Sequence, residues 1–344
     1  MITMLNDWGA AWGAWFLAAV IQNTVFLALV MAALWFLRKA SARVLAGVAT
    51  VGVFKLAVPP FVPANLLGAT AGETLGEPVM DPIAPLLFPF GNTPAADPGL
   101  VGRLTGGLGP AATLMLIWAS IVIFRLTWSF LQTVQLYVEM RRSRPVPVEE
   151  IPVAFHEAGL DLRTSPRIAV PLTMGLFNRR VLVPGAWTRW SQDDRTAVLR
   201  HEMAHIRRRD NLVQPLEVLV QAVFFFHPLV HLLIRRLRAW REMACDDLSV
   251  GADPHSRLAY SRFLLDLAED VLESRRPMAE SASTLMRHRS ELMKRISHQV
   301  KERVMNPVPK SRVILVAVVL LAAVAPLSLV QGDTPPPPPP PKKV

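Results

Sequence analysis

Residues 197–212 read AVLRHEMAHIRRRDNL, and within them His201 and His205 stand four positions apart. The preceding SQDD (191–194) supplies a helix start, with Ser191 as the N-cap and acidic residues in the first turn. The pattern predicts a helix that runs to about Arg209. Two histidines four apart on a helix project from one face, so both rings can reach one zinc ion about 2.0–2.1 Å away.

Glu202 follows His201 directly and is the residue of this motif that can take a proton from the attacking water. The same letters also describe two histidines on a helix surface with no metal between them. The motif therefore needs a third ligand from elsewhere in the chain.

A third ligand is offered by residues 235–250, RRLRAWREMACDDLSV, which are predicted to be helical. Glu242 can complete a His-His-Glu site that leaves a fourth position open, as a catalytic zinc requires. Asp246 lies one turn further on, where it can accept a hydrogen bond from the distal nitrogen of a ligand histidine. Two carboxylates at this spacing among arginines more often form a solvated ion-pair face, but their position after HEMAH favours the metal interpretation.

The composition indicates a membrane protein. Of 344 residues 51% are hydrophobic and 19% charged, the mean hydropathy is +0.32 and the formal net charge is +10. The single cysteine, Cys245, excludes an internal disulfide and a zinc site built from several cysteines, and we interpret it as a small buried hydrophobic residue. No helix-turn-helix or aromatic-basic pattern indicates direct nucleic-acid binding.

Four apolar runs predict four membrane spans, at 12–37, about 44–67, about 107–131 and 313–330. Basic residues crowd the link between spans one and two, whereas loop 69–106 holds Glu73, Glu77, Asp81 and Asp97 against a single Arg103. Positive charge marks the cytoplasmic side, so both termini are expected on the extracytoplasmic side of the membrane. The expected organisation is an N-terminal membrane region (1–135), a cytoplasmic domain (136–311), a fourth span (312–331) and a proline-rich extracytoplasmic tail (332–344).

Segment 212–234 is apolar enough to be read as a fifth span. One full crossing would put the histidines and Glu242 on opposite sides of ~30 Å of hydrocarbon, so we expect a re-entrant or interfacial hairpin at about 212–240. His227 and His231, also four apart, are either a pair satisfied at the membrane interface or a substrate contact. For the group that stabilises the oxyanion, Tyr260, His231 and several arginines are equal candidates.

Upstream of the HEMAH helix the sequence predicts short strands. Ile168–Val170 and Arg180–Val183 are rich in β-formers and are separated by Gly175 and by Asn178, which favours a turn.

The chain resembles the BlaR/MecR family of antirepressor membrane zinc metallopeptidases. The resemblance covers about residues 12–330 and rests on the span layout, VPLTMGLFNRRVLVP, HEMAH, FFFHPLV, REMACDD and, more weakly, LMRHRSELMKRIS. It implies that His201, His205 and Glu242 bind Zn²⁺ and that Glu202 is the general base. It also implies a location in the bacterial inner membrane and a strand segment that pairs with an extended substrate. That substrate is a cytoplasmic repressor of the BlaI/MecI type, and known members often cleave themselves before they cleave it.

The resemblance departs from the beta-lactam receptors of this family at the C-terminal end. The sequence stops fourteen residues after the fourth span, and none of its lysines follows a serine at the −3 position of a Ser-x-x-Lys motif. We therefore expect no penicillin-binding sensor domain here, and an input through a separate extracytoplasmic or membrane partner.

Together these patterns predict a mainly α membrane protein in which a cytoplasmic α+β zincin-like (gluzincin) domain lies between spans three and four. The predicted function is a zinc endopeptidase in transmembrane signalling. The alternative is a non-proteolytic signal transducer or scaffold with a structural zinc site.

Overall fold

The computed structural model describes residues 1–57, 107–157, 159–175, 180–250, 254–274 and 293–299, and residues 309, 311–314 and 316. Two compact units divide the chain. One contains Met1–Phe26, Pro59–Leu116 and Ile314–Val344, and the other contains Leu27–Val58 and Ile117–Val313.

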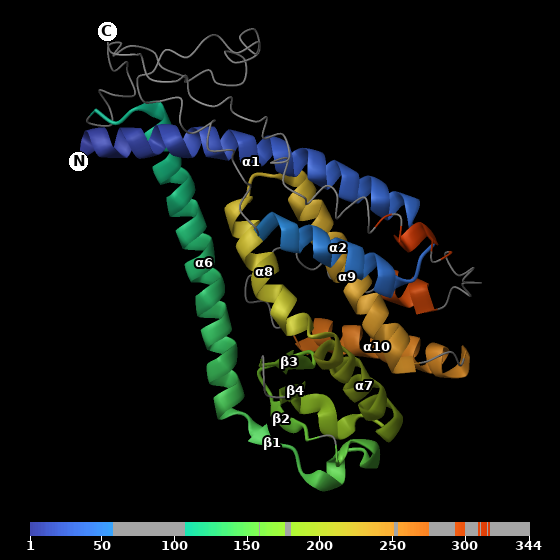
Figure 1. Ribbon diagram of the computed structural model, residues 1–344. Coiled ribbons are helices and arrows are strands. Elements are labelled where there is room, and N and C mark those ends of the chain that lie inside the picture. The colour runs from blue at the N-terminus through green and yellow to red at the C-terminus, as the bar shows by residue number, and fades with distance from the viewer. Residues whose placement is uncertain are drawn as a thin grey trace, which may run out of the picture. The chain divides into compact units, whose positions relative to one another are not determined.

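Helices dominate the described chain (Figure 1). They are α1 (Ile2–Phe36), α2 (Ala42–Ala57), α6 (Pro110–Arg142), α7 (Gln192–Arg208), α8 (Asp210–Val223), α9 (Pro228–Val250) and α10 (Pro254–Ser274), with a further helical segment at 293–299. Short 3₁₀ turns occupy Val148–Glu150, Val153–Phe155 and Gly185–Arg189. The prediction of a mainly α protein is confirmed.

Two of these helices, α1 and α6, are long and apolar enough to cross a membrane. Helix α1 begins ten residues before the expected first span, and α6 continues past the expected third span and through the expected domain boundary at 135. Helix α2 accounts for the start of the second span, whose remainder after Ala57 lies outside the described residues. The same holds for loop 69–106, most of the fourth span and the proline-rich tail.

In the first unit the start of α1 packs closely on the start of α6. The Asn6 amide donates to the carbonyl of Gly107 over 3.2 Å, and its oxygen accepts from the N–H of Gly109 over 2.8 Å. A Cβ atom at Gly9 would lie 2.4 Å from the backbone nitrogen of Ala112. Only glycine permits this approach of one backbone to the other.

A four-stranded sheet lies in the second unit, in the order β1-β2-β4-β3. The strands are β1 (Arg144–Pro145), β2 (Asp161–Ser165), β3 (Leu172–Met174) and β4 (Arg180–Pro184). Strand β2 is parallel to β4, while β1 and β3 are antiparallel to their neighbours. Strand β3 therefore stands at one edge of the sheet.

The strand predicted at Arg180–Val183 is confirmed as β4, but the one predicted at Ile168–Val170 is wrong. The latter residues lie in a bend between the turn at residues 166–167 and β3. Pro166 and Pro171 enclose this run, and neither has an N–H to donate to a ladder.

One hydrophobic core of the second unit lies between the sheet, α7 and α10. Its buried members are Val146, Leu162, Val181, Val183, Trp187, Val198, Leu199, Tyr260, Phe263 and Leu264. This core fixes α7 against the sheet, and α7 carries the two histidines of HEMAH.

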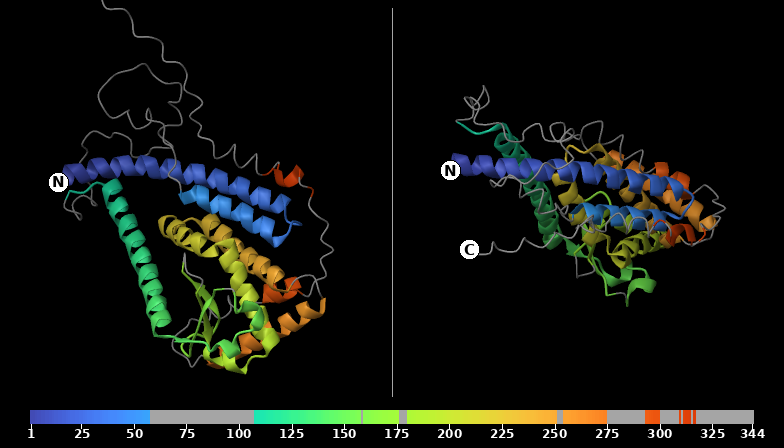
Figure 2. Two further views of the ribbon diagram at one scale, coloured as in Figure 1. Left: turned by 60° about the horizontal axis from the view of Figure 1, so that its bottom comes forward. Right: turned by 45° about the horizontal axis from the view of Figure 1, so that its top comes forward.

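The apolar segment after α7 forms two helices, α8 and α9, which turn back on each other at residues 224–227 (Figure 2, left). Glu217 of α8, with no exposed surface, accepts from the Arg238 Nε and Arg241 Nη1 atoms of α9, each over 2.7 Å. The indole of Trp118 in α6 donates to the carbonyl of Val223 at the end of α8 over 3.0 Å. Because the chain reverses direction at this turn, α9 runs back along α8 toward α7. Glu242 of α9 therefore lies close to α7.

Candidate metal centre

Helix α7 begins where the sequence predicted. The Ser191 hydroxyl accepts from the N–H of Asp194 over 3.1 Å, which confirms Ser191 as the N-cap. The helix ends at Arg208, and Arg209 follows in the left-handed conformation with a φ of 57°. The face that α7 buries includes both His201 and Glu202.

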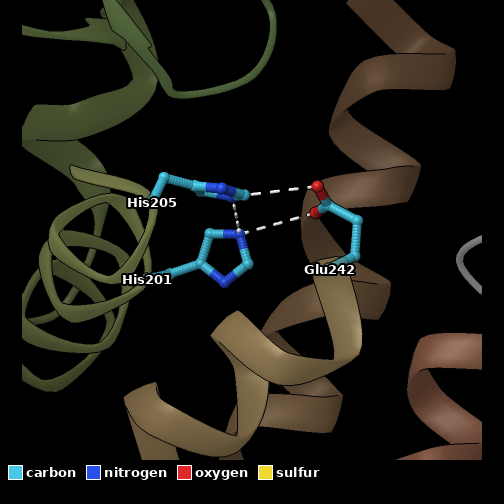
Figure 3. A group of neighbouring side chains, drawn as sticks. All are labelled: His201, His205 and Glu242. Atoms are coloured by element: carbon cyan, nitrogen blue, oxygen red, sulfur yellow. Dashed lines mark hydrogen bonds and ion pairs between the residues drawn. The ribbon is translucent and has the colours of Figure 1, made fainter. Parts of the chain in front are cut away.

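The structure brings His201, His205 and Glu242 together from α7 and α9 (Figure 3). The two Nε2 atoms are 3.2 Å apart, and the Glu242 carboxylate oxygens lie 3.6 Å from His201 Nε2 and 3.7 Å from His205 Nε2. Ligands about 2.0–2.1 Å from a tetrahedral zinc ion are about 3.3 Å from one another. The three side chains therefore fit one zinc ion.

Asp246 lies behind His201, away from His205. Its Oδ1 atom is 3.0 Å from the Nδ1 atom of His201 and accepts from the hydroxyl of Tyr260 over 2.9 Å. The carboxylate is fully buried. It is placed to accept the Nδ1 proton of His201, which leaves the Nε2 lone pair of the ring directed at Glu242 and His205.

Arg295, from the helical segment 293–299, was not singled out by the sequence analysis. Its Nε and Nη2 atoms donate to the two oxygens of Asp246 over 2.9 and 2.7 Å, and its Nη1 atom lies 3.5 Å from Glu242. The only sequence signal for this residue is its place in LMRHRSELMKRIS, the weaker part of the family resemblance.

The charges of the cluster favour a cation between the rings and Glu242. Burial alone would lower the pKa of His201, but hydrogen bonds to Asp246 and Glu242 outweigh it and raise the pKa to about 10. Burial would raise the pKa of Glu242, yet the hydrogen bond from His201 and the charge of Arg295 bring it down to about 2. Arg295 likewise holds the pKa of the buried Asp246 well below its usual range. The acidic surroundings therefore stabilise positive charge at the His201 ring, and a divalent metal ion would supply that charge in place of a proton.

A second carboxylate, Asp210, stands behind His205. Its Oδ2 atom lies 2.9 Å from the Nδ1 atom of His205 and accepts from the Arg208 Nε atom over 3.3 Å. The thiol of Cys245 donates to the same oxygen over 3.7 Å. Burial and the nearby carboxylates raise the pKa of that thiol, so it stays protonated and packs as the buried residue the sequence predicted. His205, Asp210 and Cys245 thus lie close together because they are hydrogen-bonded to one another, and their proximity does not require a second metal ion.

Glu202 is held from the sheet. The Thr173 hydroxyl in β3 donates to Glu202 Oε2, and the Asn211 amide donates to the carbonyl of Gly175 over 2.9 Å. Hydrogen bonds thereby join the edge strand β3 to Glu202 and the residue after this strand to the start of α8.

The two named oxyanion candidates lie elsewhere. The Tyr260 hydroxyl is 3.3 Å from the Nδ1 atom of His201, on the side of the ring that faces away from Glu242. His231 lies 2.8 Å from the carbonyl of Phe225 at the start of α9, about 16 Å along the helix from Glu242. These positions favour neither side chain as the group that contacts a substrate carbonyl at the cluster. The contact to Phe225 favours the interface interpretation of His231.

Comparison with known proteins agrees with this architecture. A family model described as BlaR1 peptidase M56 matches residues 108–298, which include the sheet, the HEMAH helix, Glu242 and Arg295. The regulatory protein BlaR1 of Bacillus licheniformis is 27% identical over 173 residues, which make up 50% of this chain and 28% of that relative. The match thus spans little more than a quarter of the length of the relative. The chain belongs to the BlaR1 peptidase M56 family of metallopeptidases, the BlaR/MecR type that its motifs resembled.

Proposed function

We propose that this chain is a membrane-embedded zinc endopeptidase of transmembrane signalling, in which His201, His205 and Glu242 hold the metal. The observation that carries the proposal is the close approach of these three side chains, with Glu202 next to His201 among the buried residues of α7. Both the distances between the donor atoms and the family membership support it.

Zinc at this site would polarise the scissile carbonyl and acidify the attacking water. Glu202 accepts a proton from that water and passes it to the leaving amine. The Thr173 hydroxyl fixes one carboxylate oxygen of Glu202 and leaves the other available for this transfer. Asp246 and Asp210 keep the two histidine rings in the tautomer that presents Nε2.

The substrate proposed is an extended segment of a cytoplasmic protein, such as a repressor of the BlaI/MecI type, and self-cleavage belongs to the same proposal. Strand β3 supports a peptide mode of binding because it stands at the sheet edge and contacts Glu202 through Thr173. A peptide that adds to an edge strand is held by main-chain hydrogen bonds, which suits an endopeptidase.

The topology proposed is the one expected from the sequence: both termini outside, four spans, and the peptidase domain on the cytoplasmic face. The turn between α8 and α9 supports it, because it keeps His205 and Glu242 on one side without a crossing. Membrane lipid is then the partner of the hairpin, and a separate extracytoplasmic or membrane partner supplies the signal.

The competing function is a signal transducer or scaffold in which zinc only holds the domain together. Both proposals predict bound metal, so the decisive comparison is between wild type and Glu202→Ala in cells. We expect Glu202→Ala to keep one zinc per chain, His201→Ala to lose it, and an intact cytoplasmic protein to accumulate in the Glu202→Ala strain. Identical proteomes with zinc retained would favour the scaffold.

The topology is tested by single cysteines at Arg209 and Arg236, two exposed positions on either side of the turn between α8 and α9, in a Cys245→Ser background. Both should be labelled only from the cytoplasmic side, and a cysteine at residue 90 only from outside. Labelling of the two flanking positions from opposite sides of the membrane would refute the hairpin topology.

A further inference from the structure

We propose that Arg295 is a positioning residue for the metal centre, and that the helical segment 293–299 completes a site that α7 and α9 alone leave unfinished. The inference rests on the proposed function, because it concerns the same three ligands. It assigns to that site a residue fifty-three positions beyond Glu242 in the sequence.

The first support is the number of groups that one guanidinium connects. Arg295 donates a two-pronged pair of hydrogen bonds to Asp246, contacts the Tyr260 hydroxyl over 3.3 Å and lies 3.5 Å from Glu242. The planar guanidinium matches a carboxylate with two parallel donors, and a lysine ammonium cannot reproduce this geometry. Arg295 thus orients the carboxylate behind His201 and reaches the ligand Glu242 at the same time.

The second support is the burial of Asp246. A carboxylate with no exposed surface is unfavourable unless it is paired and hydrogen-bonded. Its partners are the ring of His201, the hydroxyl of Tyr260 and the guanidinium of Arg295. Arg295 is the permanent cation among them. Without it, the two oxygens of Asp246 would lose the paired donors that hold the carboxylate in line with the Nδ1 atom of His201.

The third support is a second attachment of the same segment. One turn after Arg295, the Nε2 atom of His298 lies 2.9 Å from Asp247, the neighbour of Asp246 on α9. Gln299 also donates to Asp247, over 3.5 Å. Two consecutive acids of α9 therefore receive two side chains three positions apart, which fixes the register of the segment 293–299 on α9.

The test measures the zinc affinity of the purified full-length chain in detergent, by competition with a fluorescent zinc chelator. Arg295→Met removes the charge and keeps an unbranched side chain, and we expect it to weaken zinc binding by about tenfold to a hundredfold. Arg295→Lys keeps the charge and should recover part of that loss. The matched control is Lys294→Met, which removes an exposed cation from the same segment and should stay within about twofold of wild type.

Replacement of zinc by cobalt(II) provides a second measurement, the visible spectrum of the bound ion, which does not change when the protein merely becomes less stable. The visible spectrum of bound cobalt reports the arrangement of its ligands, so Arg295→Lys should shift it even where the protein stays folded. If Arg295→Met does not fold, Arg295→Lys alone decides. An Arg295→Lys protein with wild-type cobalt spectrum and zinc affinity would overturn the inference, as would an Arg295→Met protein that binds zinc within about twofold of wild type.

These outcomes are separable from a failure of the proposed function. If zinc content is unchanged in His201→Ala, the ligand assignment itself is wrong. If His201→Ala loses zinc and Arg295→Met keeps it, the ligand assignment is supported and the proposed role of Arg295 is wrong.

Discussion

The two histidines of the candidate metal centre each contact a carboxylate, but one carboxylate is near in the sequence and the other is distant. On the α7–α8 side (Asp210 and Arg208, with Cys245 of α9 packed against Asp210), the carboxylate behind His205 lies five residues further along the chain, just past the turn at Arg209. On the α9–α10 side (Asp246, Tyr260 and Arg295), the carboxylate behind His201 belongs to another helix, and its partners come from α10 and from the segment 293–299.

This difference separates a part of the site that local structure can form from a part that needs the finished fold. The turn from α7 into α8 carries both His205 and Asp210, so their contact costs little loop entropy. The contact between His201 and Asp246 requires α7, α9, α10 and the segment 293–299 to be in place together. We therefore expect substitutions on the α9–α10 side to have the larger effects.

The largest effect is expected for Asp246→Ala. It leaves Arg295 and Tyr260 without their acceptor in a buried place, where loss of one partner of an ion pair costs about 3–5 kcal/mol. Zinc affinity should fall by about a hundredfold, at the upper end of the range for groups that orient a metal ligand. Thermal unfolding and chelator competition measure the two losses, and Asp246→Asn should show a smaller version of both. An Asp246→Ala protein as stable as wild type would contradict the dependence of this side on long-range contacts.

Asp210→Ala is the matched change on the α7–α8 side, and a smaller effect is expected. His205 loses its acceptor, but the nearby cation Arg208 is not fully buried and can turn to water. We expect about tenfold weaker zinc binding and a stability loss of about 1–2 kcal/mol. The comparison fails if Asp210→Ala costs more in both measurements than Asp246→Ala.

Thr173→Val sharpens the comparison because it acts on the proposed base and on neither carboxylate. The hydroxyl that Glu202 accepts from is replaced by a methyl group of similar size. Zinc affinity should stay within about twofold of wild type, and the cleavage rate should fall by roughly tenfold, the value of one hydrogen bond to a charged group. The rate is measured on the substrate that the Glu202→Ala comparison identifies, with Thr173→Ser as the control that restores the donor. Lost zinc in Thr173→Val would mean that β3 supports the ligands instead of the base.

The smallest effect is expected at Cys245. Burial raises the pKa of this thiol, so at pH 8 it stays protonated, and iodoacetamide should modify it only after the protein unfolds. Cys245→Ser keeps a donor toward Asp210 and should change zinc affinity by less than about twofold. Mass spectrometry of native and denatured samples measures the modification. Rapid alkylation of the native protein would show that the α7–α8 side opens to solvent.

The parts of the site that follow from local rules could be predicted from the sequence. The N-cap at Ser191 and the shared face of His201 and His205 depend on helix periodicity and capping within one segment. Glu242 could be named because it follows HEMAH on a second helix, although only the folded chain brings it within 4 Å of both rings.

The parts that depend on distant packing or unusual backbone could not be predicted. Asp210 reads as one more polar residue after three arginines, and it faces His205 because Arg209 takes a left-handed conformation that non-glycine residues rarely adopt. Arg295 is one basic residue among many, and its partners lie far away in the sequence. Strand β2 escaped notice because DLRTS shows no apolar alternation, and it is ordered by its pairing with β4.

The indole of Trp118 joins α6 to the turn between α8 and α9, which is the end of the hairpin farthest from the metal ligands. The loop beyond Val223 is about 20 Å from Asp210 along α8, and about 20 Å from Glu242 along α9. A rotation of either helix by about 5° at the loop would displace its other end by about 2 Å. Zinc–ligand distances tolerate only about 0.2 Å. The geometry proposed for the metal centre therefore requires α8 and α9 to keep their angles nearly fixed, and the contact of Trp118 with Val223 is one restraint on them.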